Sequence, residues 1–263
     1  MSFENNIRDR FNLEGRVAVI TGASKGIGAA IAKGLAEFGA SVVVSSRKLE
    51  AVEAVAEEIR SAGGKAHAEA CHVGDPLARK ELITNTLNHF GSLDILVNNA
   101  AINPYYGPFD TISDEAFYKT FQVNLDAVRA LSNLAASHMK KEKWGSIIHL
   151  SSIESFHPGK GMGVYSLTKA TLNMLTMTQA KEWGREGIRV NAIAPGLIET
   201  KFSAALTDNA SIMRHIEENV PAGRVGQPEE IAGLAVFLAS DAGSYCTGSI
   251  YTVDGGFMLT GAL

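Results

Sequence analysis

Short apolar runs alternate along the chain with longer stretches in which hydrophobic and polar residues recur at helical spacing. The first run, Val17–Ile20, has no polar side chain, which is typical of a strand buried on both faces of a parallel sheet. A second strand, Ser41–Ser45, contains three consecutive valines. Five more strands are expected, at Lys65–Ala70, Leu93–Asn98, Ser146–Ser151, Arg189–Ala194 and Ile250–Val253.

Helical patterns separate these strands. Proline or acidic residues in the first turns mark where several helices begin. Strands joined by helical crossovers predict a single-domain α/β protein over residues 1–263. Its fold is a doubly wound Rossmann-type fold, a seven-stranded parallel sheet with helices on both faces and ligands at the carboxyl ends of the strands. The helices are expected at Ala29–Phe38, Pro76–Phe90, Asp114–Glu142, Val164–Arg185 and Pro228–Ser240.

One long irregular segment, about 195–226, interrupts the alternation, with at most a short helix near Ile212–Asn219. It follows the sixth strand and therefore leaves the same sheet edge as the loop after the first strand. Loops of this length are more often functional than idle. The segment is predicted to be a flap over the substrate; the alternative is a plain surface excursion.

Composition narrows the classes of function. The net charge of −4 gives no electrostatic footprint for nucleic acid. No apolar run approaches the eighteen residues of a membrane span, and the first residues lack the apolar stretch of a secretory signal. Two cysteines without ligand spacing predict reduced thiols and no metal. A cytoplasmic protein is expected, and the last three residues are not a peroxisomal address.

Glycines follow the first strand and precede a helix. This context predicts a phosphate-binding loop, because glycines let the backbone approach a pyrophosphate that the helix N-terminus attracts. The spacing is G-x-x-x-G-x-G, and three glycines in a turn also occur in proteins that bind nothing. The residues expected to contact the cofactor here are Gly22, Ser24, Lys25, Gly26, Ile27 and Gly28.

The end of the second strand indicates which cofactor is bound. An acidic residue there would hold the ribose 2′-hydroxyl of NAD, but this chain has Ser46, Arg47 and Lys48. These residues, with Lys25 in the glycine loop, leave room and positive charge for a 2′-phosphate. NADP(H) is therefore predicted over NAD(H). The alternative is a solvated basic turn at a helix start.

Tyr165 and Lys169 lie four residues apart in a predicted helix, and Ser152 precedes Tyr165 by thirteen residues. Positions i and i+4 share one helix face, so the phenol and the ammonium can point into one pocket. A nearby cation favours the phenolate, whereas burial opposes it. We expect Lys169 to lower the pKa of Tyr165, which then gives or takes a proton while Ser152 donates to a substrate carbonyl. The alternative is an exposed tyrosine beside a surface lysine.

Further motifs occur in a fixed order: T-G-x-x-x-G-x-G at 21–28, N-N-A at 98–100, Y-x-x-x-K at 165–169 and N-A-I-A-P-G-L-I-E-T at 191–200. With Asn124 and Ser152, they resemble the short-chain dehydrogenase/reductase family over about residues 15–256. The stretches VVVSSRK, CHVG and NAAINPYYG look like its NADPH-dependent carbonyl (retinal) reductase subgroup.

The resemblance implies roles for these positions. Tyr165 would be the general acid/base, Lys169 would also bind the nicotinamide ribose, and Asn124 would hold a water in a proton relay. Asn98 and Asn99 would secure the strand above the glycine loop. Cys71, His72 and Val73 replace the aspartate that the family often has near the adenine. A homotetramer through the two long helices is also implied. Other implied cofactor contacts are His72, Val73, Asn98, Ala100, Pro195, Gly196, Ile198 and Thr200.

The expected substrate is a medium-sized apolar or aromatic ketone or aldehyde, or the corresponding alcohol, because the pocket candidates are largely apolar and aromatic. Alternatives are an NAD-linked alcohol dehydrogenase, a 3-oxoacyl thioester reductase, or a catalytically silent nucleotide-sensing regulator. All four of Asn124, Ser152, Tyr165 and Lys169 are present, which favours an enzyme. The candidate pocket residues are Asn103, Tyr105, Glu154, Phe156, Met162, Leu197 and Phe202.

Overall fold

The computed structural model describes residues 6–259, which form one seven-stranded parallel sheet of order β3-β2-β1-β4-β5-β6-β7. The chain winds outward from β1 to β3, returns to the middle at β4 and winds outward again to β7. Loops at the carboxyl ends of β1 and β4 therefore leave in opposite directions, which opens a crevice between them. The strands are β1 Val17–Thr21, β2 Ser41–Ser46, β3 Lys65–Ala70, β4 Ile95–Asn98, β5 Gly145–Leu150, β6 Ile188–Pro195 and β7 Ile250–Val253.

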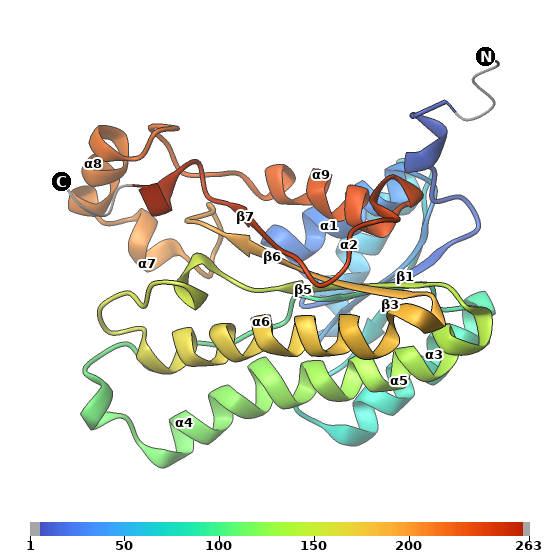
Figure 1. Ribbon diagram of the computed structural model, residues 1–263, viewed down its shortest axis with the longest axis horizontal. Coiled ribbons are helices and arrows are strands. Elements are labelled where there is room, and N and C mark those ends of the chain that lie inside the picture. Colours follow the sequence, from blue (N-terminus) through green and yellow to red (C-terminus); the bar gives the residue numbers. More distant parts are fainter. Residues whose placement is uncertain (1–5, 260–263) are drawn as a thin grey trace.

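Helices cover both faces of the sheet (Figure 1). Helices α1, α2 and α9 lie on one face, and α3, α4, α5 and α6 lie on the other. This is the fold that the sequence predicts, and it is confirmed. The pattern did not single out α2. The helices are α1 Gly26–Glu37, α2 Leu49–Ser61, α3 Pro76–Phe90, α4 Asp114–Phe121, α5 Ala127–Glu142, α6 Gly163–Trp183, α7 Ala204–Thr207, α8 Ala210–Asn219 and α9 Pro228–Ala239.

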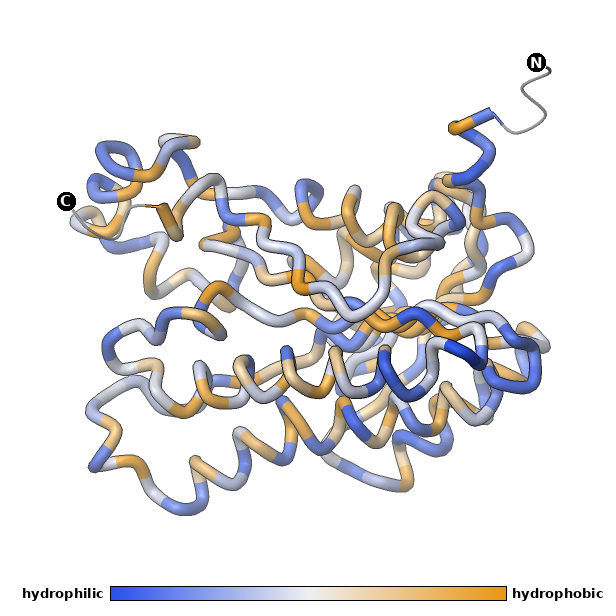
Figure 2. The backbone as a smooth tube through the Cα atoms, viewed as in Figure 1, coloured by the Kyte–Doolittle hydropathy of each residue, from blue (hydrophilic) through white to orange (hydrophobic). Residues whose placement is uncertain are grey.

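The central strands are buried along their whole length, as their apolar runs predict. Every residue of β1, β4 and β5 is buried. Each fully buried Val or Ile stabilises the fold by about 1.5–3 kcal/mol relative to an exposed one. Figure 2 shows hydrophobic and hydrophilic positions alternating along α5 and α6, and the buried residues of α5 include Leu131, Ala135 and Met139. The sheet is therefore a rigid platform for the loops at its carboxyl edge.

Polar side chains inside this core form a continuous chain. Asn98 Nδ2 lies 3.2 Å from both Ser132 Oγ and His149 Nδ1, and His149 Nε2 lies 3.0 Å from Gln179 Oε1. Burial lowers the pKa of His149 to about 4, so the imidazole is neutral near pH 7. These hydrogen bonds join α5, β4, β5 and α6 to one another below the carboxyl edge of the sheet.

The predicted helix 114–142 is not a single regular α-helix. A π-turn, Gln122–Asp126, separates α4 from α5. A π-turn inserts one residue into a helix and often occurs at a functional site. Here it buries Val123 and Asn124. The sequence expectation is corrected at this point.

The segment after β6 contains two short helices, α7 and α8, where at most one was expected. An isolated bridge joins Ile198 to Gly226, so the two ends of the segment meet. Ile216, Val220 and Val225 form a small apolar cluster of their own beneath it. The segment is a compact unit attached to the main core at its base. Its action as a flap stays a prediction.

Large apolar side chains remain exposed on α6, among them Leu167, Met174 and Met177. The predicted tetramer would cover this face; it stays a prediction that light scattering would test. No helix within residues 6–259 is long and apolar enough to cross a membrane.

Candidate active site

The carboxyl end of β5 and the first two turns of α6 bring three of the expected catalytic residues together. Ser152 lies two residues after the end of β5. Tyr165 and Lys169 lie on α6 and are only 7% and 3% exposed. Lys169 Nζ lies 5.4 Å from the centroid of the Tyr165 ring and donates a hydrogen bond of 2.6 Å to the carbonyl of Leu150. The pair is therefore not the exposed tyrosine and surface lysine of the alternative interpretation.

Burial dominates the electrostatics of this pair. Burial lowers the pKa of Lys169 to about 8. Burial also raises the pKa of Tyr165; a hydrogen bond with Ser152 opposes this rise, and the charge of Glu154 adds to it. The sequence predicted a lowered Tyr165 pKa, so this expectation is corrected. The physical reason is that removing water from the phenolate outweighs the stabilisation from its neighbours.

Asn124 reaches the site from the π-turn. Its Oδ1 accepts a hydrogen bond of 2.8 Å from Ile102 N, and its Nδ2 donates to Ile102 O at 2.9 Å and to Thr168 Oγ1 at 3.1 Å. The side chain therefore joins the loop after β4 to α6. Sequence reasoning did not include Thr168; its position next to Lys169 on a buried helix face was the available signal.

Two glycines let the loop after β1 approach the loop after β4. Gly22 has φ +65°, and a Cβ on Gly28 would come within 2.5 Å of Asn99 Nδ2. Asn99 Nδ2 donates to the carbonyls of Thr21 and Gly22, both at 3.0 Å. Asn99 thus holds the glycine loop, whereas the side chain of Asn98 turns into the core. Thr21 was not among the candidates, yet its Oγ1 accepts from the N–H groups of Asn99 and Ala100.

The start of α1 fits a dinucleotide phosphate. Among the described residues, no side chain caps this helix start: the N-cap residue Lys25 makes no capping hydrogen bond. The N–H groups of its first turn are thus available to phosphate oxygens. Ser45 pairs with Thr21 in the sheet register, which places Ser46 and Arg47 beside Gly22. No carboxylate within residues 6–259 forms an ion pair with Lys25, Arg47 or Lys48.

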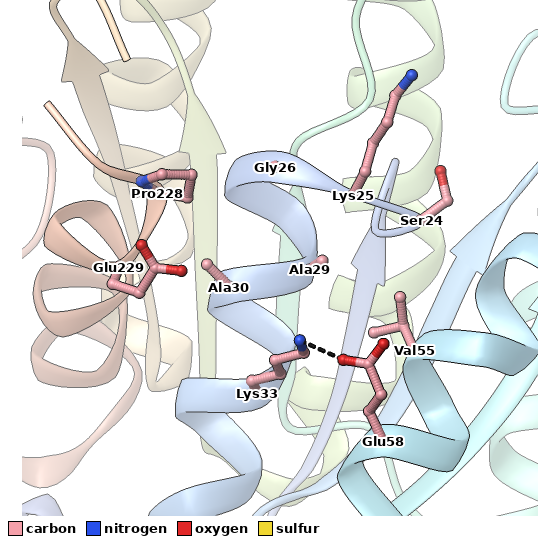
Figure 3. A pocket seen from close by; sticks show the side chains of 10 residues that line it. All are labelled: Ser24, Lys25, Gly26, Ala29, Ala30, Lys33, Val55, Glu58, Pro228 and Glu229. Atoms are coloured by element: carbon pink, nitrogen blue, oxygen red, sulfur yellow. Dashed lines mark ion pairs between the residues drawn. The ribbon is translucent and has the colours of Figure 1, made fainter. Parts of the chain in front are cut away.

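The glycine loop also borders a cavity of about 250 Å³ between α1, α2 and the start of α9 (Figure 3). An ion pair of 2.5 Å between Lys33 and Glu58 crosses one wall, and Lys25 extends away from it. None of the four expected catalytic residues lines this cavity. It lies outside the proposed reaction centre.

The remaining cofactor candidates lie along the same edge. His72 follows β3, and its Nδ1 accepts a hydrogen bond of 3.0 Å from Gly74 N. The ring therefore shapes the turn that carries Val73. Pro195 ends β6, and a Cβ on Gly26 would come within 3.0 Å of Thr200 Cγ2. The segment containing Gly196 and Ile198 thus lies across from the glycine loop.

The substrate candidates divide into those near Tyr165 and those occupied elsewhere. The ring of Phe202 lies 6.0 Å from that of Tyr165, centroid to centroid. Tyr105 OH lies within hydrogen-bonding distance of Pro108 O and Thr111 Oγ1. Leu197 packs against the apolar cluster beneath α8. Phe156 is exposed, and Asn103 Nδ2 contacts Met162 Sδ at 3.1 Å.

Known proteins match this chain over most of its length. The family model described as enoyl-(acyl carrier protein) reductase matches residues 22–258. The rabbit (Oryctolagus cuniculus) protein named dehydrogenase/reductase SDR family member 4 is 38% identical over 252 residues, which cover 96% of this chain and 97% of the relative. The chain belongs to the short-chain dehydrogenase/reductase family. It is therefore an oxidoreductase of this family, as the motifs indicate.

Solved structures agree with this assignment. A gluconate 5-dehydrogenase from Burkholderia cenocepacia, in complex with NADP and tartrate, has a TM-score of 0.92 and 37% identity, with 98% of this chain and 100% of that chain covered. A 7α-hydroxysteroid dehydrogenase, complexed with NADH and 7-oxo glycochenodeoxycholic acid, has a TM-score of 0.91 and 36% identity, with 94% and 96% covered. Members with very similar folds thus differ in both substrate and cofactor.

Proposed function

We propose that this enzyme transfers hydride between NADP(H) and a carbonyl/secondary alcohol pair, with an apolar or aromatic ketone or aldehyde as the substrate. The observation that carries the proposal is the burial of Tyr165 and Lys169 on one helix face, beside Ser152 and on the sheet edge that carries the glycine loop. A protein that only senses nucleotide would not need a buried phenol and a buried ammonium there, since each is costly to bury.

The roles follow from the atoms. Bound NADP(H) would supply the hydride, held by the glycine loop, Lys25, Ser46 and Arg47. Ser152 Oγ would donate a hydrogen bond to the substrate oxygen, and Tyr165 OH would give its proton to that oxygen in the reductive direction. Lys169, held by the Leu150 carbonyl, would supply positive charge near the phenol.

Asn124 would complete this arrangement as a positioning residue. It holds α6 at Thr168 and the loop after β4 at Ile102. In the family its position would also order a water between Lys169 and the surface. That water would return the proton that Tyr165 gives up.

The apolar surroundings of Tyr165 support the substrate class. Phe202 lies beside its ring, and exposed aromatic rings at Tyr106, Phe109 and Phe156 come from the loops after β4 and β5. Such rings bind flat apolar bodies better than sugar acids. Glu154 is an acidic neighbour of Tyr165 and would repel an anionic tail.

A panel of carbonyl compounds followed by NADPH absorbance tests the function. Aromatic ketones, α-dicarbonyls and long aldehydes are expected to be reduced at least about tenfold better, in kcat/KM, than gluconate-type keto acids or acyl thioesters, a difference of about 1.4 kcal/mol. A 3-oxoacyl thioester turned over a hundredfold faster than any neutral ketone would instead support the thioester reductase. No turnover of any compound with either cofactor would favour the silent regulator.

Cofactor preference gives a separate prediction. The unpaired cations at Lys25 and Arg47 are expected to favour NADPH over NADH by at least about tenfold in kcat/KM. Arg47→Asp combined with Ser46→Asp should erase or reverse this ratio, because carboxylates repel the 2′-phosphate and accept from the ribose hydroxyls. Lys65→Asp, an exposed change at the far end of β3, is the matched control. Equal wild-type rates with both cofactors would favour the NAD-linked alternative.

A further inference from the structure

The loop between β5 and α6, residues 153–162, is joined to α6 by Glu154 and by Ser155, whose Oγ accepts a hydrogen bond of 2.8 Å from Asn173 Nδ2. Oε2 of Glu154 accepts hydrogen bonds from Gly159 N at 2.6 Å and from Ser166 Oγ at 2.9 Å. The first bond fixes the far side of the loop, and the second fixes the first turn of α6. Glu154 lies two residues after Ser152, and Ser166 is adjacent to Tyr165. One carboxylate oxygen thus joins the segments that carry both reacting hydroxyl groups.

The same anchor extends to the loop after β4. Ser166 Oγ also lies 3.0 Å from Met162 O, and Met162 Sδ accepts from Asn103 Nδ2 at 3.1 Å. Close by, Gly107 N donates to Gly161 O at 3.1 Å. The two loops that form the substrate side of the site are therefore joined to each other. Glu154 joins the second loop to the first turn of α6, and Ser155 joins it to Asn173 further along the same helix.

The backbone at Gly159 lies close against the carboxylate of Glu154. A Cβ at residue 159 would come within 2.8 Å of Glu154 Oε1 and 3.2 Å of Oε2. Gly159 does not have a positive φ, so its backbone alone would accept alanine. A side chain at residue 159 would have to displace the carboxylate of Glu154 from its two hydrogen bonds.

We propose that Glu154 is a positioning residue that holds loop 153–162 and the start of α6 together, and so sets the distance between Ser152, Tyr165 and the substrate. This rests on the proposed function. The anchoring group is a hydrogen-bond acceptor, and both bonds end on the same oxygen atom. A neutral amide oxygen at that position can accept the same two bonds.

Four variants test the proposal. Glu154→Ala is expected to lower kcat/KM between about tenfold and a hundredfold, mainly by raising KM for the carbonyl substrate, because small displacements of reacting groups are costly. Glu154→Gln should retain at least about a third of wild-type kcat/KM, since its amide oxygen replaces Oε2. Gly159→Ala should behave like Glu154→Ala, and Ser166→Ala should have a smaller effect. The NADPH dissociation constant should stay within about twofold in all of them.

A double variant separates positioning from general damage. In the Glu154→Ala background, Gly159→Ala meets no carboxylate and should have no further effect, whereas independent changes would multiply. Ser137→Ala and Glu182→Ala are matched controls: Ser137 makes the same kind of bond to its own helix on α5, and Glu182 is exposed at the far end of α6. Both should leave kinetics unchanged. Should Glu154→Ala fail to fold, Gly159→Ala and Ser166→Ala carry the test.

Hydrogen exchange gives a readout that does not depend on turnover. The amide hydrogen of Gly159 should exchange faster in Glu154→Ala than in the wild type. Its exchange rate should be unchanged in Glu154→Gln. If the wild type is active and Glu154→Ala changes neither kcat/KM nor the exchange rate of the Gly159 amide, the anchor is overturned. A Glu154→Gln variant as impaired as Glu154→Ala would also overturn it. A wild type that reduces no carbonyl compound overturns the proposed function instead, and the exchange result still decides whether the anchor exists.

Discussion

Tyr165→Phe is expected to lower kcat between about a hundredfold and ten-thousandfold, the usual contribution of a positioned acid/base. Phenylalanine keeps the buried ring and its contact with Phe202, and it removes only the hydroxyl. Burying the phenol oxygen costs free energy that its hydrogen bond with Ser152 offsets, so removing both should change the free energy of unfolding little. Stopped-flow measurement with a ketone that the wild type reduces should show that the rate of reduction is lost. NADPH binding, measured by fluorescence, should be retained.

Tyr245→Phe is the matched control for this change, because Tyr245 is fully exposed. It should leave kcat unchanged. A Tyr165→Phe enzyme that keeps more than about a tenth of wild-type kcat would show that the phenol is not the proton donor. The raised pKa of Tyr165 also favours the neutral, proton-donating form near pH 7, which suits carbonyl reduction.

Lys169→Met is expected to remove most activity and to stabilise the protein near pH 7. The fall of the Lys169 pKa from 10.5 to about 8 corresponds to about 3 kcal/mol of cost for the buried charge. The lost hydrogen bond to the Leu150 carbonyl offsets about 1 kcal/mol of that gain. The variant should therefore unfold with a free energy about 2 kcal/mol higher than the wild type.

The stabilisation should depend on pH in one direction. Since the folded pKa of Lys169 is below its unfolded value, the unfolded chain binds more protons between about pH 8 and 10.5, and wild-type stability rises with pH across that window. The gain in the free energy of unfolding from Lys169→Met is complete below pH 8 and should shrink towards pH 10.5. Urea unfolding at several pH values measures it. Lys181→Met, an exposed change on the same helix, is the control, and an advantage of methionine that grew with pH would contradict the assignment.

Most of the fold could be predicted from the short apolar runs in the sequence. Val17–Ile20 and Ser41–Ser45 predicted strands because short runs of this composition are typical of strands buried on both faces of a parallel sheet. The ends of these strands then located the glycine loop and Arg47. The Y-x-x-x-K spacing likewise placed Tyr165 and Lys169 on one face, since helical periodicity is a local property.

Features set by tertiary contacts could not be predicted in the same way. Residues 122–126 contain no glycine or proline, so nothing local marks the π-turn. The pKa of Tyr165 depends on how much water the folded chain excludes, which no local spacing reveals. Glu154 was expected in the substrate pocket because it follows Ser152, but only the folded loop shows that its carboxylate binds Gly159 and Ser166.

The π-turn lets the long helix hold one residue more than a regular α-helix would hold over the same rotation. An α-helix advances about 100° per residue, so one extra residue in a regular helix would rotate α5 by that angle relative to α4. Leu131, Ser132 and Ala135, which are buried on α5, would then turn away from the core. The wider turn absorbs the extra residue, so α5 keeps its buried side while Asn124 is still carried into the core. The irregularity therefore acts as a spacer that separates the position of Asn124 from the packing of α5.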